Sequence, residues 1–117
     1  MARPTIPASG AKVDESAVSA AACVSMGLQG WIGFASWMTF GLLLEGLLGY
    51  KIPAYLADPQ RRELFRLAHA HGTLLSLLLV VAALWIERCH AAPPRAVCFI
   101  LRLGTVLLPA GFLIAGI

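Results

Sequence analysis

Three long apolar stretches dominate the pattern of hydrophobic and polar positions along the chain. They run from about residue 23 to 50, from about 67 to 86 and from about 96 to 117, and they predict spans over about 23–50, 62–87 and 96–117. A helix needs roughly 20 mostly apolar residues to cross the hydrocarbon core of a bilayer. The third stretch carries Arg102, so we expect a short final span or a natural chain that continues past residue 117. The pattern predicts an all-α integral membrane protein with about three transmembrane helices in an up-down arrangement.

Polar and helix-breaking residues separate these stretches. Asp58 stands directly before Pro59, a pairing that predicts a helix N-cap followed by proline at the first helical position. Pro93 and Pro94 break the second link. Residues 1–22 have no apolar core typical of a signal peptide, so we expect a mobile or interfacial tail before a single transmembrane domain over 23–117.

Composition supports a lipid environment. Apolar residues make up 59% of the chain, charged residues 13%, and the mean hydropathy is +0.79. A soluble domain has about 25% charged residues. The net charge of +3 lies beside the apolar stretches, as expected for residues that flank membrane spans, and indicates the lipid bilayer rather than nucleic acid as partner.

The first stretch carries a ridge of mostly small residues at a spacing of four: Gly33, Trp37, Gly41, Glu45 and Gly49. Small residues let transmembrane helices approach closely, so the ridge is expected to pack on a neighbouring helix. A carboxylate inside the membrane is costly and needs a partner or a changed protonation state. Glu45 is therefore either a buried part of this packing or the centre of a proton or cation site.

A polar stripe follows one face of the second stretch. Its members recur at alternating spacings of four and three: Arg62, Arg66, His69, Thr73, Ser76, Val80, Ala83 and Glu87. We expect this face to lie against protein rather than lipid. Up-down topology brings Glu45 to the depth of Arg66 and His69, so a pair between Glu45 and either residue is allowed. The same reasoning pairs Glu87 with Arg102 at the opposite membrane face.

His69 and His71 suggest two hypotheses, either haem or metal ligation or interhelical hydrogen bonding. Two residues on a helix differ by roughly 200° of rotation, so both imidazoles do not readily ligate one metal. His71 lies among leucines, and we expect another subunit or a cofactor to cover it. The His-x-His pattern is similar to that of haem-copper oxidases, in which one helix ligates two haems, but the resemblance covers only these three residues.

A further group of potential ligands is expected on one side of the membrane near the interface: Cys23, Cys89, His90 and Cys98. Topology allows either a zinc site or a Cys89–Cys98 disulfide there. The spacing matches no standard zinc motif.

The segment FGLLLEGL at residues 40–47, Tyr55-Leu56, and RELFRLAHAHGTLL at residues 62–75 together resemble an uncharacterised family of small bacterial polytopic membrane proteins. The resemblance covers about a third of the chain and brings no activity with it. It implies about four spans and a place in the bacterial inner membrane.

The sequence contains no nucleophile–base pair, phosphate-binding loop or carboxylate dyad, so we do not expect an enzyme. We expect a non-catalytic accessory or assembly subunit of a larger, bioenergetic membrane complex for respiratory or photosynthetic electron transfer. The basis is too few helices for a substrate path, a glycine ridge, and polar groups on more than one face. The alternatives are a haem- or metal-binding membrane protein using His69 and His71, and a small oligomeric ion or proton transporter around Glu45.

Overall fold

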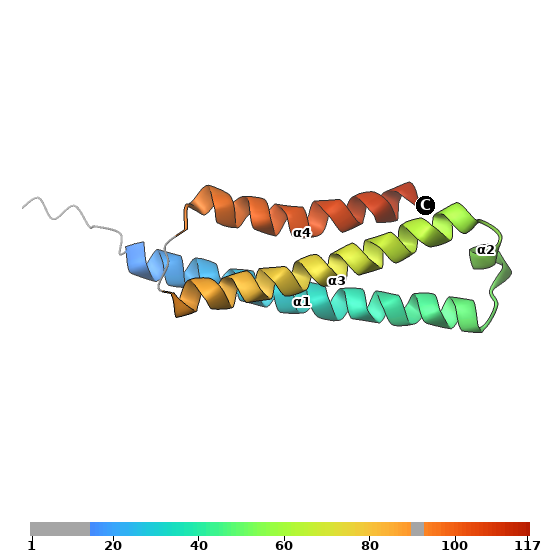
Figure 1. The fold of residues 1–117 in the computed structure, drawn as a ribbon, viewed down its shortest axis with the longest axis horizontal. Helices are drawn as coiled ribbons and strands as arrows, with labels where there is room; N and C mark the ends of the chain where they lie inside the picture. The colour runs from blue at the N-terminus through green and yellow to red at the C-terminus, as the bar shows by residue number, and fades with distance from the viewer. Residues whose placement is uncertain (1–14, 90–92) are drawn as a thin grey trace, which may run out of the picture.

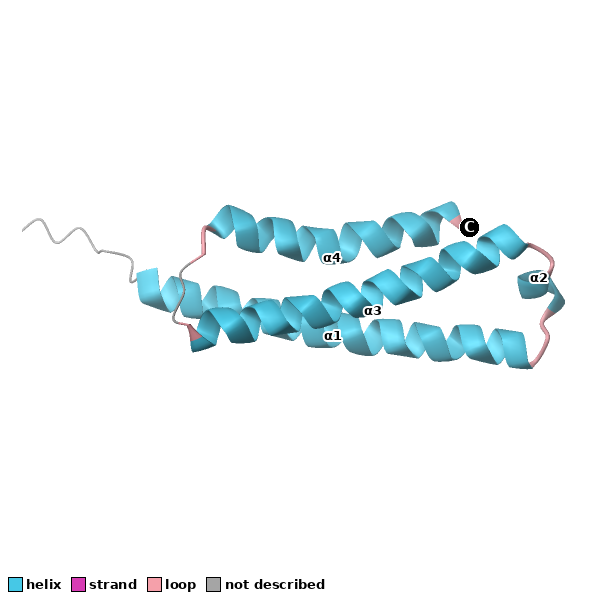
Figure 2. Cartoon of the chain, in the orientation of Figure 1, coloured by secondary structure: helices cyan, strands magenta, loops and turns pink. Residues whose placement is uncertain are grey.

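The computed structural model describes residues 15–89 and 93–117. They form α1 (Glu15–Gly49), the short α2 (Pro53–Leu56), α3 (Pro59–Arg88) and α4 (Arg95–Ala115), with no strand in the described part of the chain (Figures 1 and 2). Three segments are long and apolar enough to cross a membrane: Val24–Gly49, Pro59–Arg88 and Arg95–Ala115. The predicted all-α, up-down fold with three transmembrane helices is confirmed. Most of the expected tail lies outside the described residues.

The central helix is α3. It packs against α1 on one side and α4 on the other, whereas α1 and α4 touch each other only slightly (Figure 1). A small apolar core joins the three helices near the α3–α4 link: Met26, Leu79, Ala83, Ile86 and Cys98. Most other large apolar side chains on the long helices face outward and are exposed. An apolar exterior around a small core is the arrangement expected when lipid rather than water surrounds the helices.

Glycines of α1 bring its backbone against α3. A Cβ atom on Gly30 would lie 3.0 Å from both the carbonyl oxygen of Ser76 and the amide nitrogen of Val80. A Cβ on Gly33 would meet the Ser76 side chain, with Cβ–Cβ at 3.3 Å. The absence of side chains at these positions is what permits the close approach.

The predicted ridge is confirmed from Gly33 to Gly41 but not beyond. A Cβ added at Gly46 or Gly49 would have no neighbour within 4 Å, because α1 and α3 have separated at this end. There α2 bridges the two helix ends (Figure 1). The Tyr55 side chain of α2 is buried. The separation opens a space between α1 and α3.

The polar stripe of α3 is buried only along its middle. Ser76, Val80 and Ala83 are buried, while Arg66 and Glu87 near the helix ends are exposed. The expectation that the stripe faces protein is therefore confirmed for its centre and wrong for its ends. The long charged side chains of Arg66 and Glu87 are not packed against another helix.

The start of α3 follows the predicted cap. Asp58 Oδ1 accepts hydrogen bonds from the backbone N–H groups of Gln60 at 3.0 Å and Arg61 at 3.1 Å, and Pro59 occupies the first turn. The helix begins at Pro59, as the predicted cap requires.

The end of α1 is closed by a left-handed residue. Lys51 has φ of 53°, its N–H donates to the carbonyl of Leu48 at 3.1 Å, and the N–H of Ile52 donates to Leu47 at 3.1 Å. These bonds form a Schellman motif, in which glycine is the usual left-handed residue. A lysine at this position is strained by its Cβ.

Candidate functional site

An open groove lies between the C-terminal half of α1 and the N-terminal half of α3, next to α2. Its volume is about 830 Å³, within the range of roughly 300–1,000 Å³ typical of small-molecule sites. The lining residues come from all three helices: Met38, Gly41, Leu42, Leu44, Glu45, Leu48, Tyr55, Arg62, Glu63, Arg66, Leu67, His69 and Ala70. We call this space the α1/α3 groove.

The groove changes character with depth. Its charged side chains lie towards the α2 end, where α1 ends and α3 begins: Glu45, Arg62, Glu63 and Arg66. His69 is two helical turns deeper than Arg62, about 10 Å along the helix axis. At this level the lining consists of Met38, Gly41, Ala70 and the imidazole itself. The groove therefore has a charged mouth and an apolar inner end with one titratable ring.

His69 is fixed by α1. Its Nδ1 lies 2.8 Å from the carbonyl oxygen of Trp37, and the imidazole lies directly over Gly41, where a Cβ would collide with it. The Thr73 hydroxyl is 3.5 Å from the same nitrogen. Because a carbonyl oxygen only accepts, Nδ1 carries a proton, and in the neutral imidazole Nε2 is then the acceptor.

The contact between α1 and α3 is reciprocal, because a side chain of α1 also packs on a glycine of α3. The Trp37 indole lies over Gly72, where a Cβ would collide with its ring. Two aromatic rings thus occupy two glycine positions on opposite helices. This pair of contacts fixes the rotation of α3 relative to α1.

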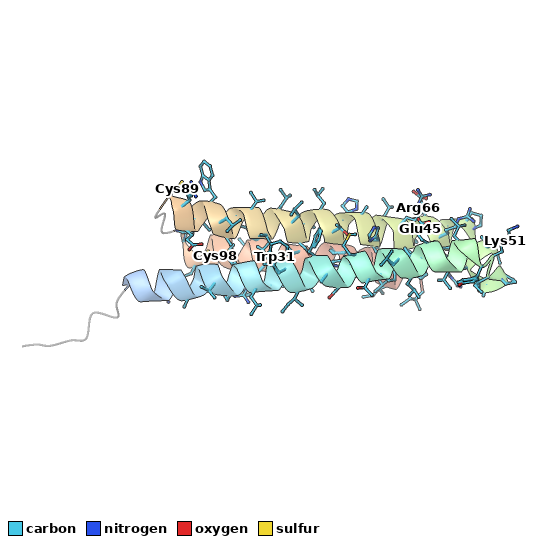
Figure 3. All side chains as sticks on the ribbon, turned by 90° about the horizontal axis from the view of Figure 1, so that it is seen from below. Trp31, Glu45, Lys51, Arg66, Cys89 and Cys98 are labelled. Carbon is cyan, nitrogen blue, oxygen red and sulfur yellow. The ribbon has the colours of Figure 1, made fainter. Side chains whose placement is uncertain are left out.

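Glu45 and Arg66 line the same groove and lie at the same end of the molecule (Figure 3). The expected pair between them is not formed. Arg66 Nη1 instead lies 3.7 Å from Glu63 Oε2 on its own helix, the one ion pair among the described residues. Both of these side chains are more than 60% exposed. The separation of α1 and α3 at this level explains why the pair within α3 forms and the pair between helices does not.

His71 faces α4. Its Nδ1 lies 2.9 Å from the carbonyl oxygen of Leu67, and its ring centroid is 5.0 Å from that of Phe112. The prediction that the two histidines face different neighbours is confirmed. The expectation that another subunit or a cofactor covers His71 is corrected, because α4 of the same chain does so.

A second polar cluster joins α1 to α4. Arg102 Nε donates to Gln29 Oε1 at 2.6 Å, and Arg102 Nη1 donates to Ser25 Oγ at 3.3 Å. Gln29 Nε2 donates in return to the Arg102 carbonyl at 3.0 Å and to Thr105 Oγ1 at 3.2 Å. The expected Glu87–Arg102 pair is therefore wrong. In the sequence Gln29 was visible only as a polar interruption of the first stretch.

The cysteines lie at the opposite end from Glu45 (Figure 3). Cys89 is exposed, Cys98 is buried, and both are free, so the disulfide considered from the sequence is not formed. The Cys23 side chain and His90 lie outside the described residues. Among the described residues no three His, Cys, Asp or Glu side chains converge as a metal site.

A smaller apolar groove of about 260 Å³ lies between α3 and α4. It is lined by Leu75, Leu78, Leu79, Ala82, Ile100, Leu101, Gly104, Thr105 and Leu108. A Cβ added at Gly104 would have no neighbour within 4 Å, so the groove floor is open at this residue.

Comparison with known proteins gives no match to a family model, to a curated protein or to a solved structure.

Proposed function

We propose that the chain is a non-catalytic accessory or assembly subunit of a larger membrane protein complex, of the electron-transfer kind found in the bacterial inner membrane. The observation that carries this proposal is the environment of Arg102. This cation lies in a helix that is long and apolar enough to span a membrane, and the two side-chain partners of its guanidinium among the described residues, Gln29 and Ser25, are uncharged.

The depth of Arg102 makes its charge costly. It lies about two turns inside α4, roughly 10 Å from the start of the helix at Arg95. Charged residues within membrane spans generally pair with other protein groups, because hydrocarbon does not solvate them. The Arg102 side chain is exposed on the outside of the helices. A carboxylate on a helix of another subunit would complete the site.

The apolar groove between α3 and α4 supports the same role. Gly104 and Gly111 lie two turns apart on one face of α4, and a Cβ added at either would meet nothing within 4 Å. Small residues on an outward face allow a neighbouring helix to approach closely. The groove therefore suits a transmembrane helix of a partner subunit.

The test is extraction of the chain from its native membrane in mild detergent, followed by native size measurement and identification of the bound subunits. We expect a complex containing other subunits. Arg102→Gln and Gly104→Leu should release the chain from this complex. Gly46→Leu is the matched control, because that position also has open space but lies on α1 away from both features.

A second control separates the partner contact from the internal cluster. Gln29→Leu removes the internal acceptor of Arg102 but keeps the charge, so the complex should persist. A monodisperse monomer from the wild-type membrane would contradict the proposal. An assembly made only of copies of this chain would also contradict it and would favour the alternative of an oligomeric transporter around Glu45.

A further inference from the structure

We propose that the α1/α3 groove binds a lipophilic phenol or hydroquinone, whose ring hydroxyl donates a hydrogen bond to Nε2 of His69. This inference is independent of the accessory role, because it concerns a small ligand and the side of α3 that faces α1. It depends on the orientation of one imidazole, the accessibility of one nitrogen and the change in lining with depth.

The orientation of His69 leaves one nitrogen for a ligand. Nδ1 is occupied by the Trp37 carbonyl at 2.8 Å, which fixes the tautomer and makes Nε2 the acceptor. The two nitrogens lie on opposite sides of the Cε1 atom that rests on Gly41.

Nε2 is also accessible. It has no hydrogen bond to any of the described residues. Among the described side chains, Arg61 Nε is the one nitrogen or oxygen atom that is both fully buried and without a hydrogen bond, so Nε2 of His69 is not fully buried. Part of the surface of this nitrogen is therefore accessible, and His69 is one of the residues that line the groove. An imidazole held by a backbone carbonyl through one nitrogen presents the other in a fixed direction.

The lining around this nitrogen selects an uncharged donor. At the level of His69 the groove is lined by Met38, Gly41 and Ala70, so a charged ligand bound there would lose its hydration without a partner, at high cost. The small side chains at Gly41 and Ala70 leave room for a ring beside the imidazole. Met38 suits an aromatic ring, because thioether sulfur makes favourable contacts with ring edges.

The other residues that line the groove suit an apolar tail attached to the hydroxylated ring. The charged mouth contains two acidic and two basic side chains, so it presents no net charge to a ligand: Glu45, Glu63, Arg62 and Arg66. Leu42 and Leu48 line the groove and are exposed at its lipid edge. An alkyl tail would lie along these leucines and leave sideways into the bilayer. The molecule that fits has a hydroxylated ring and an apolar tail.

The experiment measures equilibrium binding of a decyl-substituted benzohydroquinone to the full chain in lipid nanodiscs, next to its dimethyl ether, which lacks both hydroxyl donors. We expect the wild-type chain to prefer the hydroquinone by about two- to tenfold, the range for one net hydrogen bond. His69→Asn keeps an amide donor at the position of Nδ1 and removes Nε2, so it should bind both compounds equally.

Two further variants test the location. Ala70→Phe fills the inner end of the groove and should weaken binding of both compounds at least tenfold. Ala35→Phe is the matched control on an exposed face of α1 outside the groove, and should bind as the wild type does. If His69→Asn does not fold, the ligand pair on the wild type and the two phenylalanine variants still decide the question.

Four results would overturn the proposal. They are equal affinity of the wild type for hydroquinone and ether, no binding of either, a preference retained in His69→Asn, and unchanged binding in Ala70→Phe. A haem absorption band in the purified chain that disappears in His69→Asn would also overturn it, because Nε2 would then be a metal ligand.

Discussion

Nδ1 of His69 donates a hydrogen bond to the carbonyl oxygen of Trp37, 2.8 Å away, across the interface between α3 and α1. In a helix this carbonyl already accepts the N–H of the residue four positions later, which here is Gly41. Because Gly41 has no side chain, the imidazole can lie over it and reach the second lone pair of the same oxygen. The glycine and the histidine thus act together as one interhelical contact.

Removal of the imidazole should weaken the α1–α3 interface. Hydrogen bonds between membrane helices contribute about 0.6 kcal/mol on average and up to about 1.7, and loss of the ring also leaves a partial cavity. We expect His69→Ala to lower the free energy of unfolding in detergent by about 2 kcal/mol. His69→Asn, which retains the donor, should lose less than half of that. Equal stability of His69→Ala and the wild type would show that this bond contributes nothing.

A methyl group at the closest approach of the two helices should be more damaging. In Gly30→Ala the new Cβ would lie 3.0 Å from two backbone atoms of α3, which cannot rotate away. We expect a loss of about 1–3 kcal/mol, the usual cost of overpacking. Gly46→Ala is the control with no neighbour within 4 Å and should be neutral or slightly stabilising. The prediction fails if the two variants unfold at the same denaturant concentration.

The contact between α1 and α4 should depend on the side-chain amide of Gln29. Gln29→Leu keeps the side-chain volume but removes the acceptor of Arg102 Nε and the donor to the Arg102 carbonyl. We expect a loss of about 1–2 kcal/mol, because the guanidinium keeps its charge without that acceptor. Unfolding in detergent measures the change, and Ser36→Ala is the control, since its hydroxyl bonds only within α1, to the Ile32 carbonyl. An equal effect of both variants would contradict this role of Gln29.

The left-handed residue after α1 offers a stabilising substitution. Lys51 has φ of 53°, and glycine adopts this conformation without a Cβ penalty. We expect Lys51→Gly to raise the free energy of unfolding by about 0.5–1 kcal/mol. Lys51→Ala removes the same charge but keeps the Cβ, so it should give no gain. A gain in both variants would assign the effect to charge rather than to backbone conformation.

The helices could be predicted because the bilayer fixes their length. Each apolar stretch is long enough for one span, and Asp58 with Pro59 marks the start of the second one. Spacing along a helix also gave the correct faces for Gly33, Gly41 and His69. These features depend only on the order of residues within one helix, so they can be predicted from the sequence.

The polar partners could not be predicted, because they depend on how each helix is rotated and where two helices separate. Equal depth allowed Glu45 to pair with Arg66, but α1 and α3 have diverged at that level. Equal depth also predicts a pair between Glu87 and Arg102, whereas in the structure Arg102 bonds to the uncharged Gln29. The ring of Phe112 over His71 depends on the rotation of α4, for which the sequence has no signal.

The central position of α3 has a consequence for how the domain reaches its final form in the membrane. A chain interrupted after Arg88 would still contain the glycine contacts, the Trp37 carbonyl and its imidazole partner. Deletion of α3 would leave α1 and α4 with little more than the bonds around Gln29 and Arg102 to hold them. We therefore expect α1 and α4 to become fixed relative to each other only through their contacts with α3.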